Sequence, residues 1–186
     1  MRIAALIFAM LALASCSKPA PDKQWHMTDI SGAMPKLDFH MTANGKPVTG
    51  ADFKGKVVAL YFGYSHCPDI CPTTLANLTD MLSKVNSPDV RVLFVTVDPD
   101  RDTDAVMTDY AKAFSPQVVG LRGTPNTLAT LARDYRVAYE VKRGPPYEVM
   151  HSNAVFFFDR DGKTRLVTTD TSDASAMAED VKRLLH

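Results

Sequence analysis

Residues 56–75 read KVVALYFGYSHCPDICPTTL, and this stretch predicts a strand that leads directly into a helix. Lys56 to Gly63 form a mostly apolar run rich in valine and aromatic residues, which is typical of a strand buried on both faces. Pro72 suits the first turn of a helix, because that position needs no backbone N–H. Apolar residues then recur on one helix face: Leu75, Leu78, Met81, Leu82 and Val85. Cys67 and Cys71 therefore lie at a strand-to-helix junction.

The rest of the chain continues to alternate strand and helix patterns. Asn44-Gly45 and Asp161-Gly162 are hairpin turn signals, because these pairs tolerate the positive φ angles of tight turns. The expected elements are strands at 90–99 and 118–121, helices at 103–114, 124–137 and 173–185, and a strand–turn–strand unit at 153–169. The order predicts an α/β fold: a mixed sheet flanked by helices, with an N-terminal β-hairpin and a hairpin insertion near the C-terminus.

Composition limits the size and the partners of the molecule. The chain has 186 residues, of which 46% are hydrophobic, and this length suits one globular domain. Its 21 Lys and Arg residues balance 21 Asp and Glu residues. Because there is no basic excess to neutralise a phosphate backbone, we expect no nucleic-acid partner.

The N-terminus resembles an export signal. Arg2 precedes an apolar run from Ile3 to Leu13, and small residues follow up to Cys16. Leu13-Ala14-Ser15-Cys16 is similar to a bacterial lipobox, although a plain signal peptide with a chance cysteine has the same features. We expect a signal peptide at 1–15, a lipidated tether at 16–30 and the folded domain at 31–186. The protein would then be a periplasm-facing lipoprotein of a bacterial cell envelope, on either membrane, with Cys16 as its lipid anchor.

The spacing of Cys67 and Cys71 favours reactive sulfurs. Residues four apart share a helix face, so the two sulfurs can meet in a disulfide or around a metal ion. The N–H groups at a helix start also lower the pKa of a thiol. A structural disulfide would close a very short loop and stabilise little. Redox dithiol and metal site both remain open.

A third ligand residue near the two cysteines would favour a metal site over a redox dithiol. His151 precedes a buried strand, in a loop that would reach the cysteines if that strand lies beside the strand feeding them. His26, His40 and His186 are expected at the surface. His66, next to Cys67, could either tune the pKa of the thiolate or coordinate the metal. Two thiolates and one imidazole form a soft set that suits Cu(I), or Cu(II) with one more donor, better than zinc.

Three blocks of the sequence resemble the Sco/SenC family: residues 55–75, residues 95–103 (VTVDPDRDT) and residues 151–159 (HSNAVFFFD). The resemblance implies a thioredoxin-like fold and copper held by Cys67, Cys71 and His151. It also implies a role in assembling the binuclear copper site of cytochrome c oxidase, with the copper-bearing subunit as partner. Asp98 resembles a family position near the site, where it would support a ligand or contact a partner. Alternatively, Asp98 caps the turn that follows it, and Arg101 and Asp102 form a local ion pair.

Two functions remain at this stage. The first is a copper chaperone without turnover, which would exchange copper with the oxidase subunit and with other copper chaperones. The second is a thiol-disulfide oxidoreductase that uses Cys67 and Cys71 on exported client cysteines, so whether the protein is an enzyme stays open. A disulfide between the two cysteines cannot take up copper. A periplasmic thiol reductase is therefore an expected partner.

Overall fold

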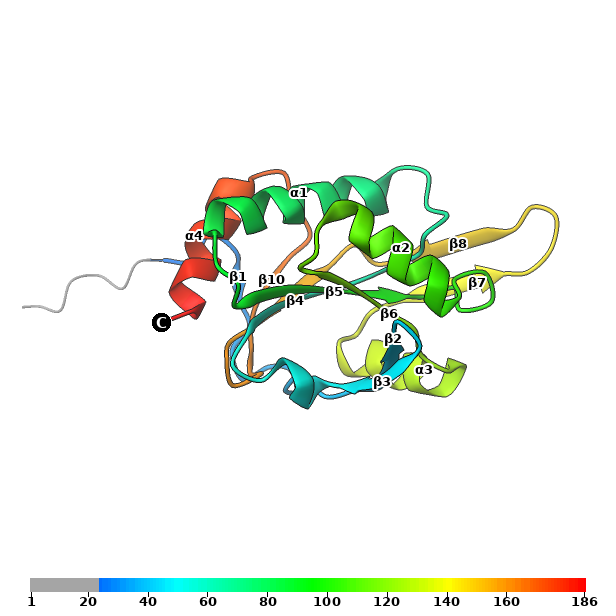
Figure 1. The fold of residues 1–186 in the computed structure, drawn as a ribbon, viewed down its shortest axis with the longest axis horizontal. Helices are drawn as coiled ribbons and strands as arrows, with labels where there is room; N and C mark the ends of the chain where they lie inside the picture. Colours follow the sequence, from blue (N-terminus) through cyan, green and yellow to red (C-terminus); the bar gives the residue numbers. More distant parts are fainter. Residues whose placement is uncertain (1–23) are drawn as a thin grey trace, which may run out of the picture.

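A computed structural model describes residues 24–186, and a six-stranded sheet runs through its centre (Figure 1). In chain order, the strands are β1 (Thr28–Asp29), β2 (His40–Ala43), β3 (Lys46–Thr49), β4 (Val57–Gly63), β5 (Val90–Thr96), β6 (Val118–Leu121), β7 (Tyr139–Lys142), β8 (Glu148–His151), β9 (Val155–Phe158) and β10 (Thr164–Thr168). The helices are the 3-10 helix η1 (Gly50–Phe53) and the α-helices α1 (Ile70–Val85), α2 (Asp104–Phe114), α3 (Pro125–Asp134) and α4 (Ala174–Leu184).

The sheet is mixed, as the sequence predicts, and its strand order is β1-β10-β9-β4-β5-β6. Strand β4 lies between β5, which is parallel to it, and β9, which is antiparallel. All seven residues of β4 are buried, which confirms the interpretation of its apolar run. The hairpin expected at Asn44-Gly45 is the β2–β3 pair, and the one expected at Asp161-Gly162 is the β9–β10 pair.

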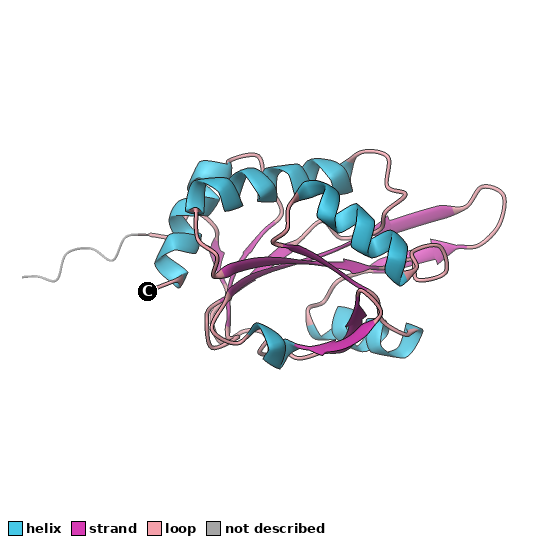
Figure 2. Cartoon of the chain, in the orientation of Figure 1, coloured by secondary structure: helices cyan, strands magenta, loops and turns pink. Residues whose placement is uncertain are grey.

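Helices cover both faces of the sheet (Figure 2). Helices α1, α2 and α4 lie on one face, whereas α3 and the β2–β3 hairpin lie on the other. The predicted face of α1 is buried throughout, from Leu75 to Val85, and the helix ends where Asn86 adopts a left-handed conformation at φ 52°. Packing on β4 therefore fixes where α1 begins, at the carboxyl end of that strand.

The folded domain begins earlier than the sequence indicates. Residues 24–30 were expected to belong to a tether, yet β1 pairs with β10 at the edge of the sheet. The backbone N–H groups of His26 and Met27 both donate to Asp180 Oδ2, at 2.9 and 2.8 Å, and the Met27 side chain is buried. The sequence shows no clear sign of this segment, because two prolines lie nearby and its contacts, a two-residue strand, one buried carboxylate and the Met27 side chain, leave no periodic apolar pattern.

The hairpin β7–β8 is a second difference from expectation. It forms a separate two-stranded sheet and extends past the end of the main sheet (Figure 1). None of its strand residues is fully buried, so its alternation of half-buried and exposed residues left only a weak signal.

Among residues 24–186, no helix combines the length and the apolar character that crossing a bilayer requires. The expected signal peptide at 1–15, the lipidated Cys16 and the tether up to residue 23 lie outside the described residues.

Candidate metal centre

Cys67, Cys71 and His151 converge at the carboxyl end of β4. Cys67 lies in the loop after β4, Cys71 in the first turn of α1, and His151 at the end of β8. Their candidate ligand atoms all lie within 4.8 Å of one another, and His151 Nε2 is 3.3 Å from Cys71 Sγ. The expected juxtaposition of strands produces this arrangement, since β9 follows His151 and pairs with β4. His151 itself ends a strand rather than lying in a loop.

The two cysteines differ in their environment. Burial alone would raise the pKa of the Cys67 thiol, but backbone N–H groups of Asp69 and Cys71 donate to its sulfur and hold the pKa below its usual range. Cys71 has an exposed fraction of 0%, and burial raises the pKa of its thiol to about 12. The helix start therefore stabilises the thiolate of Cys67, whereas burial favours the protonated thiol of Cys71.

His151 is set up as a neutral nitrogen donor. Its Nδ1 lies 2.9 Å from the carbonyl oxygen of Ser152. Because a carbonyl only accepts, Nδ1 carries the proton and the lone pair of Nε2 faces Cys71 Sγ. Burial lowers the pKa of the imidazole, which keeps it uncharged. The rings of Tyr61 and Tyr64 meet the imidazole edge to face, with centroids 6.1 and 5.8 Å away, and they restrict its rotation.

Gly63 provides the space that the Cys71 sulfur occupies. A Cβ atom at this position would lie 2.9 Å from Cys71 Sγ and 2.6 Å from the ring of Phe94. Both distances are well inside ordinary contact, so no larger residue fits without moving the sulfur. The sequence gives no signal for this role, because Gly63 reads only as the last residue of a buried strand.

A buried carboxylate holds the loop that carries Cys67. Asp102 accepts hydrogen bonds from the backbone N–H of Ser65, from the Ser65 hydroxyl and from Thr96 Oγ1. The sequence paired Asp102 with Arg101, but Arg101 instead pairs with Asp98. His66 is half exposed and its Nδ1 lies 3.0 Å from the Ser65 hydroxyl oxygen, so its ring belongs to this loop network and not to the three-atom group.

Asp98 lies away from the three-atom group but contacts the hairpin that carries His151. Its exposed fraction is 1%, and its carboxylate accepts from the Tyr147 hydroxyl at 2.7 Å and from Arg101 Nε. Its role therefore differs from a simple turn cap. The remaining histidines do not join the group: His40 and His186 are exposed, and the His26 ring contacts Glu179.

The donor set determines which metal the group suits. Two sulfurs and one imidazole nitrogen are soft ligands of low coordination number, which favours Cu(I). Structural zinc needs four protein ligands, and within residues 24–186 the cluster offers three. The neutral imidazole and the stabilised Cys67 thiolate both present lone pairs in the form that a metal requires.

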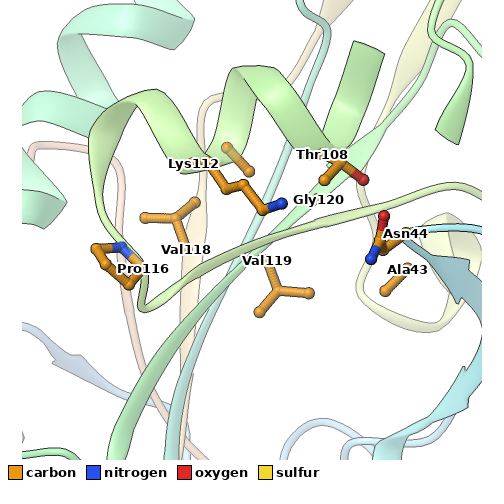
Figure 3. A pocket seen from close by; sticks show the side chains of 9 residues that line it. Ala43, Asn44, Thr108, Lys112, Pro116, Val118, Val119 and Gly120 are labelled. Atoms are coloured by element: carbon orange, nitrogen blue, oxygen red, sulfur yellow. The ribbon is translucent and has the colours of Figure 1, made fainter. Parts of the chain in front are cut away.

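Of the hollows on the surface of the described residues, two differ clearly in their position relative to the cysteines. One borders the cysteines and is lined by residues of the Cys67 loop and of β8, with Ile70 and Met150 exposed at its rim, at 51% and 56%. The other lies between α2, β6 and the β2–β3 turn (Figure 3), and Lys112 is its only titratable residue. The first hollow gives a partner access to Cys67, whereas the second is separate from the chemistry.

Comparisons with known proteins agree with this geometry. Residues 32–186 match the family model described as SCO1/SenC. The mitochondrial SCO2 homolog of Mus musculus is 36% identical over 194 residues, which cover 96% of this chain and 74% of that protein. For the relatives from Bos taurus and Saccharomyces cerevisiae, the match covers 53% and 46% of their length.

Solved structures resemble the described fold closely. ScoI of Arabidopsis thaliana with copper bound has a TM-score of 0.74 and 33% identity, over 80% of this chain and 96% of that one. ScoI of Bradyrhizobium japonicum with copper bound has a TM-score of 0.72 and 34% identity, over 80% and 98%. The thioredoxin-like α/β fold is thereby confirmed.

The localisation expected from the N-terminus is wrong. The curated relatives from mouse, cattle, yeast and human are mitochondrial proteins, not lipoproteins of a bacterial envelope. That expectation rested on Ile3–Leu13 and Cys16, outside the described residues. A short apolar run followed by small residues and a chance cysteine carries too little information to specify a compartment. The ligands of the first and third sequence blocks, by contrast, converge at one site, and together with the family match they show that the chain belongs to the SCO1/SenC family.

Proposed function

We propose that this protein binds one copper ion through Cys67 Sγ, Cys71 Sγ and His151 Nε2 and transfers it to the binuclear copper site of cytochrome c oxidase. The convergence of the three ligand atoms within 4.8 Å carries the proposal. Two structures of similar proteins, from Arabidopsis thaliana and Bradyrhizobium japonicum, were solved with copper bound. The client follows from the family resemblance of the three sequence blocks.

The protein's own residues divide the work of holding and releasing the ion. Cys71 is fully buried, and the half-buried His151 imidazole packs against the rings of Tyr61 and Tyr64. Cys67 is half-buried and faces the hollow bordered by Ile70 and Met150. An incoming ligand from the copper-bearing subunit reaches the metal from the Cys67 side, and the two exposed apolar side chains offer it contact area. Other copper chaperones would load the ion through the same opening.

Reduction must precede copper binding. Oxidation of the two cysteines forms a bond between Cys67 Sγ and Cys71 Sγ and releases two electrons and two protons, which removes both thiolate ligands. A thiol reductase partner returns those electrons by attack of its own thiolate on the disulfide. Cys67 is the sulfur that such a partner reaches, since Cys71 has no exposed surface.

An anaerobic titration tests the proposal. The reduced protein is expected to bind one equivalent of Cu(I), measured by competition with a chromophoric chelator. His151→Ala leaves the metal two-coordinate and open to solvent and should weaken binding at least tenfold. His40→Ala is the matched control, because His40 is an exposed histidine outside the cluster. Equal affinities for the wild type and His151→Ala would refute copper binding at this site.

The split between the cysteines favours a second candidate function, thiol-disulfide exchange with client cysteines. A low thiol pKa at the half-buried Cys67 and a raised one at the buried Cys71 are the properties of an attacking and a resolving thiol. In this case Cys67→Ser abolishes reduction of a small disulfide substrate while His151→Ala retains it. Loss of reductase activity in His151→Ala, with folding intact, would contradict this candidate.

A further inference from the structure

The hairpin β7–β8 delivers His151 to the cysteines although little of the core holds it. Its strands pair with each other and not with the main sheet. None of its strand residues is fully buried, and the hairpin extends past the end of the sheet (Figure 1). A two-stranded ribbon of this kind is marginal by itself. Contacts with the body of the protein must therefore determine where the imidazole lies.

One face of the hairpin makes these contacts at regular spacing. Tyr147, Val149 and His151 are half-buried, whereas Glu148 and Met150 between them are exposed. Side chains two residues apart share a face of a strand, so these three point toward the body together. His151 meets the cysteines, Val149 packs beside one of the apolar clusters, and Tyr147 meets the loop after β5.

Tyr147 contacts the body of the protein through both its hydroxyl and its ring. Its hydroxyl donates to Asp98 Oδ1 at 2.7 Å, and the Arg101 guanidinium lies over its ring at 4.0 Å from the centroid. Asp98 cannot shift to follow the tyrosine, because its other oxygen accepts from Arg101 Nε and its backbone N–H donates to Thr96 Oγ1. The carboxylate is buried in the loop that continues a core strand. Tyr147 therefore binds a fixed point.

A second contact at the hairpin tip contributes less. Arg143 Nε donates to Asp100 Oδ2 at 2.6 Å, but both side chains are largely exposed. Exposed ion pairs contribute little, because water and salt screen them. A hydrogen bond to a buried, charged carboxylate is among the stronger ones in proteins. The free end of the hairpin is thus held mainly by Tyr147.

We infer that Tyr147 is a positioning residue for His151: its hydrogen bond to Asp98 closes the hairpin on the body and sets the distance between the imidazole and the two sulfurs. The inference rests on the proposed copper site. Tyr147 and His151 are four positions apart in an extended chain, which corresponds to about 13 Å. With the tip released, the hairpin samples positions in which Nε2 lies beyond bonding range. Apparent copper affinity then falls in proportion to the closed fraction.

Tyr147→Phe is the sharpest perturbation, because it removes the hydroxyl and keeps the ring beneath Arg101. Tyr139→Phe is its matched control: the same change on the same hairpin, at a hydroxyl with no hydrogen-bond partner among residues 24–186. Tyr147→Phe should lower Cu(I) affinity of the reduced protein about tenfold, since a hydrogen bond to a charged group shifts an equilibrium by about that factor. Tyr139→Phe should stay within about twofold of wild type.

Two further readouts separate positioning from general damage. In a His151→Ala background, Tyr147→Phe should cause no additional loss of Cu(I) affinity, because the residue acts only through the imidazole. In the metal-free protein, Tyr147→Phe should speed amide hydrogen exchange of residues 148–151 and leave β4 and β5 unchanged. Unchanged affinity in Tyr147→Phe, or an equal loss in the His151→Ala background, would overturn the inference. If wild type binds no Cu(I), the proposed function fails, while the exchange comparison still decides whether Tyr147 closes the hairpin.

Discussion

Gly63→Ala should weaken copper binding by crowding the Cys71 sulfur. The added methyl would lie 2.9 Å from Cys71 Sγ and 2.6 Å from the Phe94 ring, whereas ordinary contacts of such atoms are about 3.5–4.0 Å. Both contacts are too short, so the Cys71 sulfur must move by about 0.6 Å and the Phe94 ring by about 0.9 Å relative to the new methyl. The Phe94 ring is fully buried against Tyr61 and Tyr110, which limits how far it can yield, so the sulfur is displaced as well. Metal sites tolerate about 0.2 Å in ligand distance.

The expected magnitude follows from these distances. Overpacking of a filled core costs about 1–3 kcal/mol of folding stability. A change in a residue that positions a metal ligand weakens metal binding about 10- to 100-fold. Urea unfolding of the metal-free protein measures the first quantity, and competition with a Cu(I) chelator measures the second.

A second glycine separates lost stability from lost affinity. Gly120 lies in β6, and a Cβ there would collide with the backbone carbonyl of Met107, away from the cysteines. Gly120→Ala should therefore destabilise the fold at least as much as Gly63→Ala and leave copper affinity unchanged. The reasoning is refuted if Gly63→Ala binds Cu(I) as wild type does, or if Gly120→Ala loses affinity to the same degree.

Two further outcomes are expected. Burial raises the pKa of the Cys71 thiol from its ordinary value of 9.0 to about 12, so between these pH values the folded state keeps a proton that the unfolded state loses. This contribution to the stability of the reduced, metal-free protein should be intact below pH 9 and be lost as the pH rises toward 12. Urea unfolding at several pH values measures it. Asp180→Ala removes the acceptor of two backbone N–H groups and should cost about 3 kcal/mol and red-shift the fluorescence of Trp25, the chain's one tryptophan, which lies beneath Arg183. Glu179→Ala, an exposed neighbour, should cost less than about 1 kcal/mol, and an unshifted Trp25 spectrum in Asp180→Ala would contradict this account of the N-terminal segment.

The parts of this fold that sequence predicts are those with a periodic apolar pattern. The run Val57–Gly63 and the helical spacing from Leu75 to Val85 specify β4 and α1 and, with them, the place of the cysteines. His151 could be selected because polar residues precede a buried strand. Gly63 and Asp102 could not, because their roles depend on which atoms lie across a loop or beneath a strand, and no local pattern records those distances.

The hairpin β7–β8 escaped prediction for a reason that also bears on function. Cys67 and Cys71 belong to a junction held by the most buried strand of the sheet, whereas His151 belongs to a ribbon with no fully buried strand residue. The hairpin has a weak sequence signal and few stabilising contacts with the core for the same reason, because little apolar surface is buried there. If all three ligands sat on the rigid core, binding and release would both require opening that core. With one ligand on a ribbon held mainly through Tyr147, the imidazole can leave while the two sulfurs keep their geometry, and the copper transfer we propose would then break only one local contact.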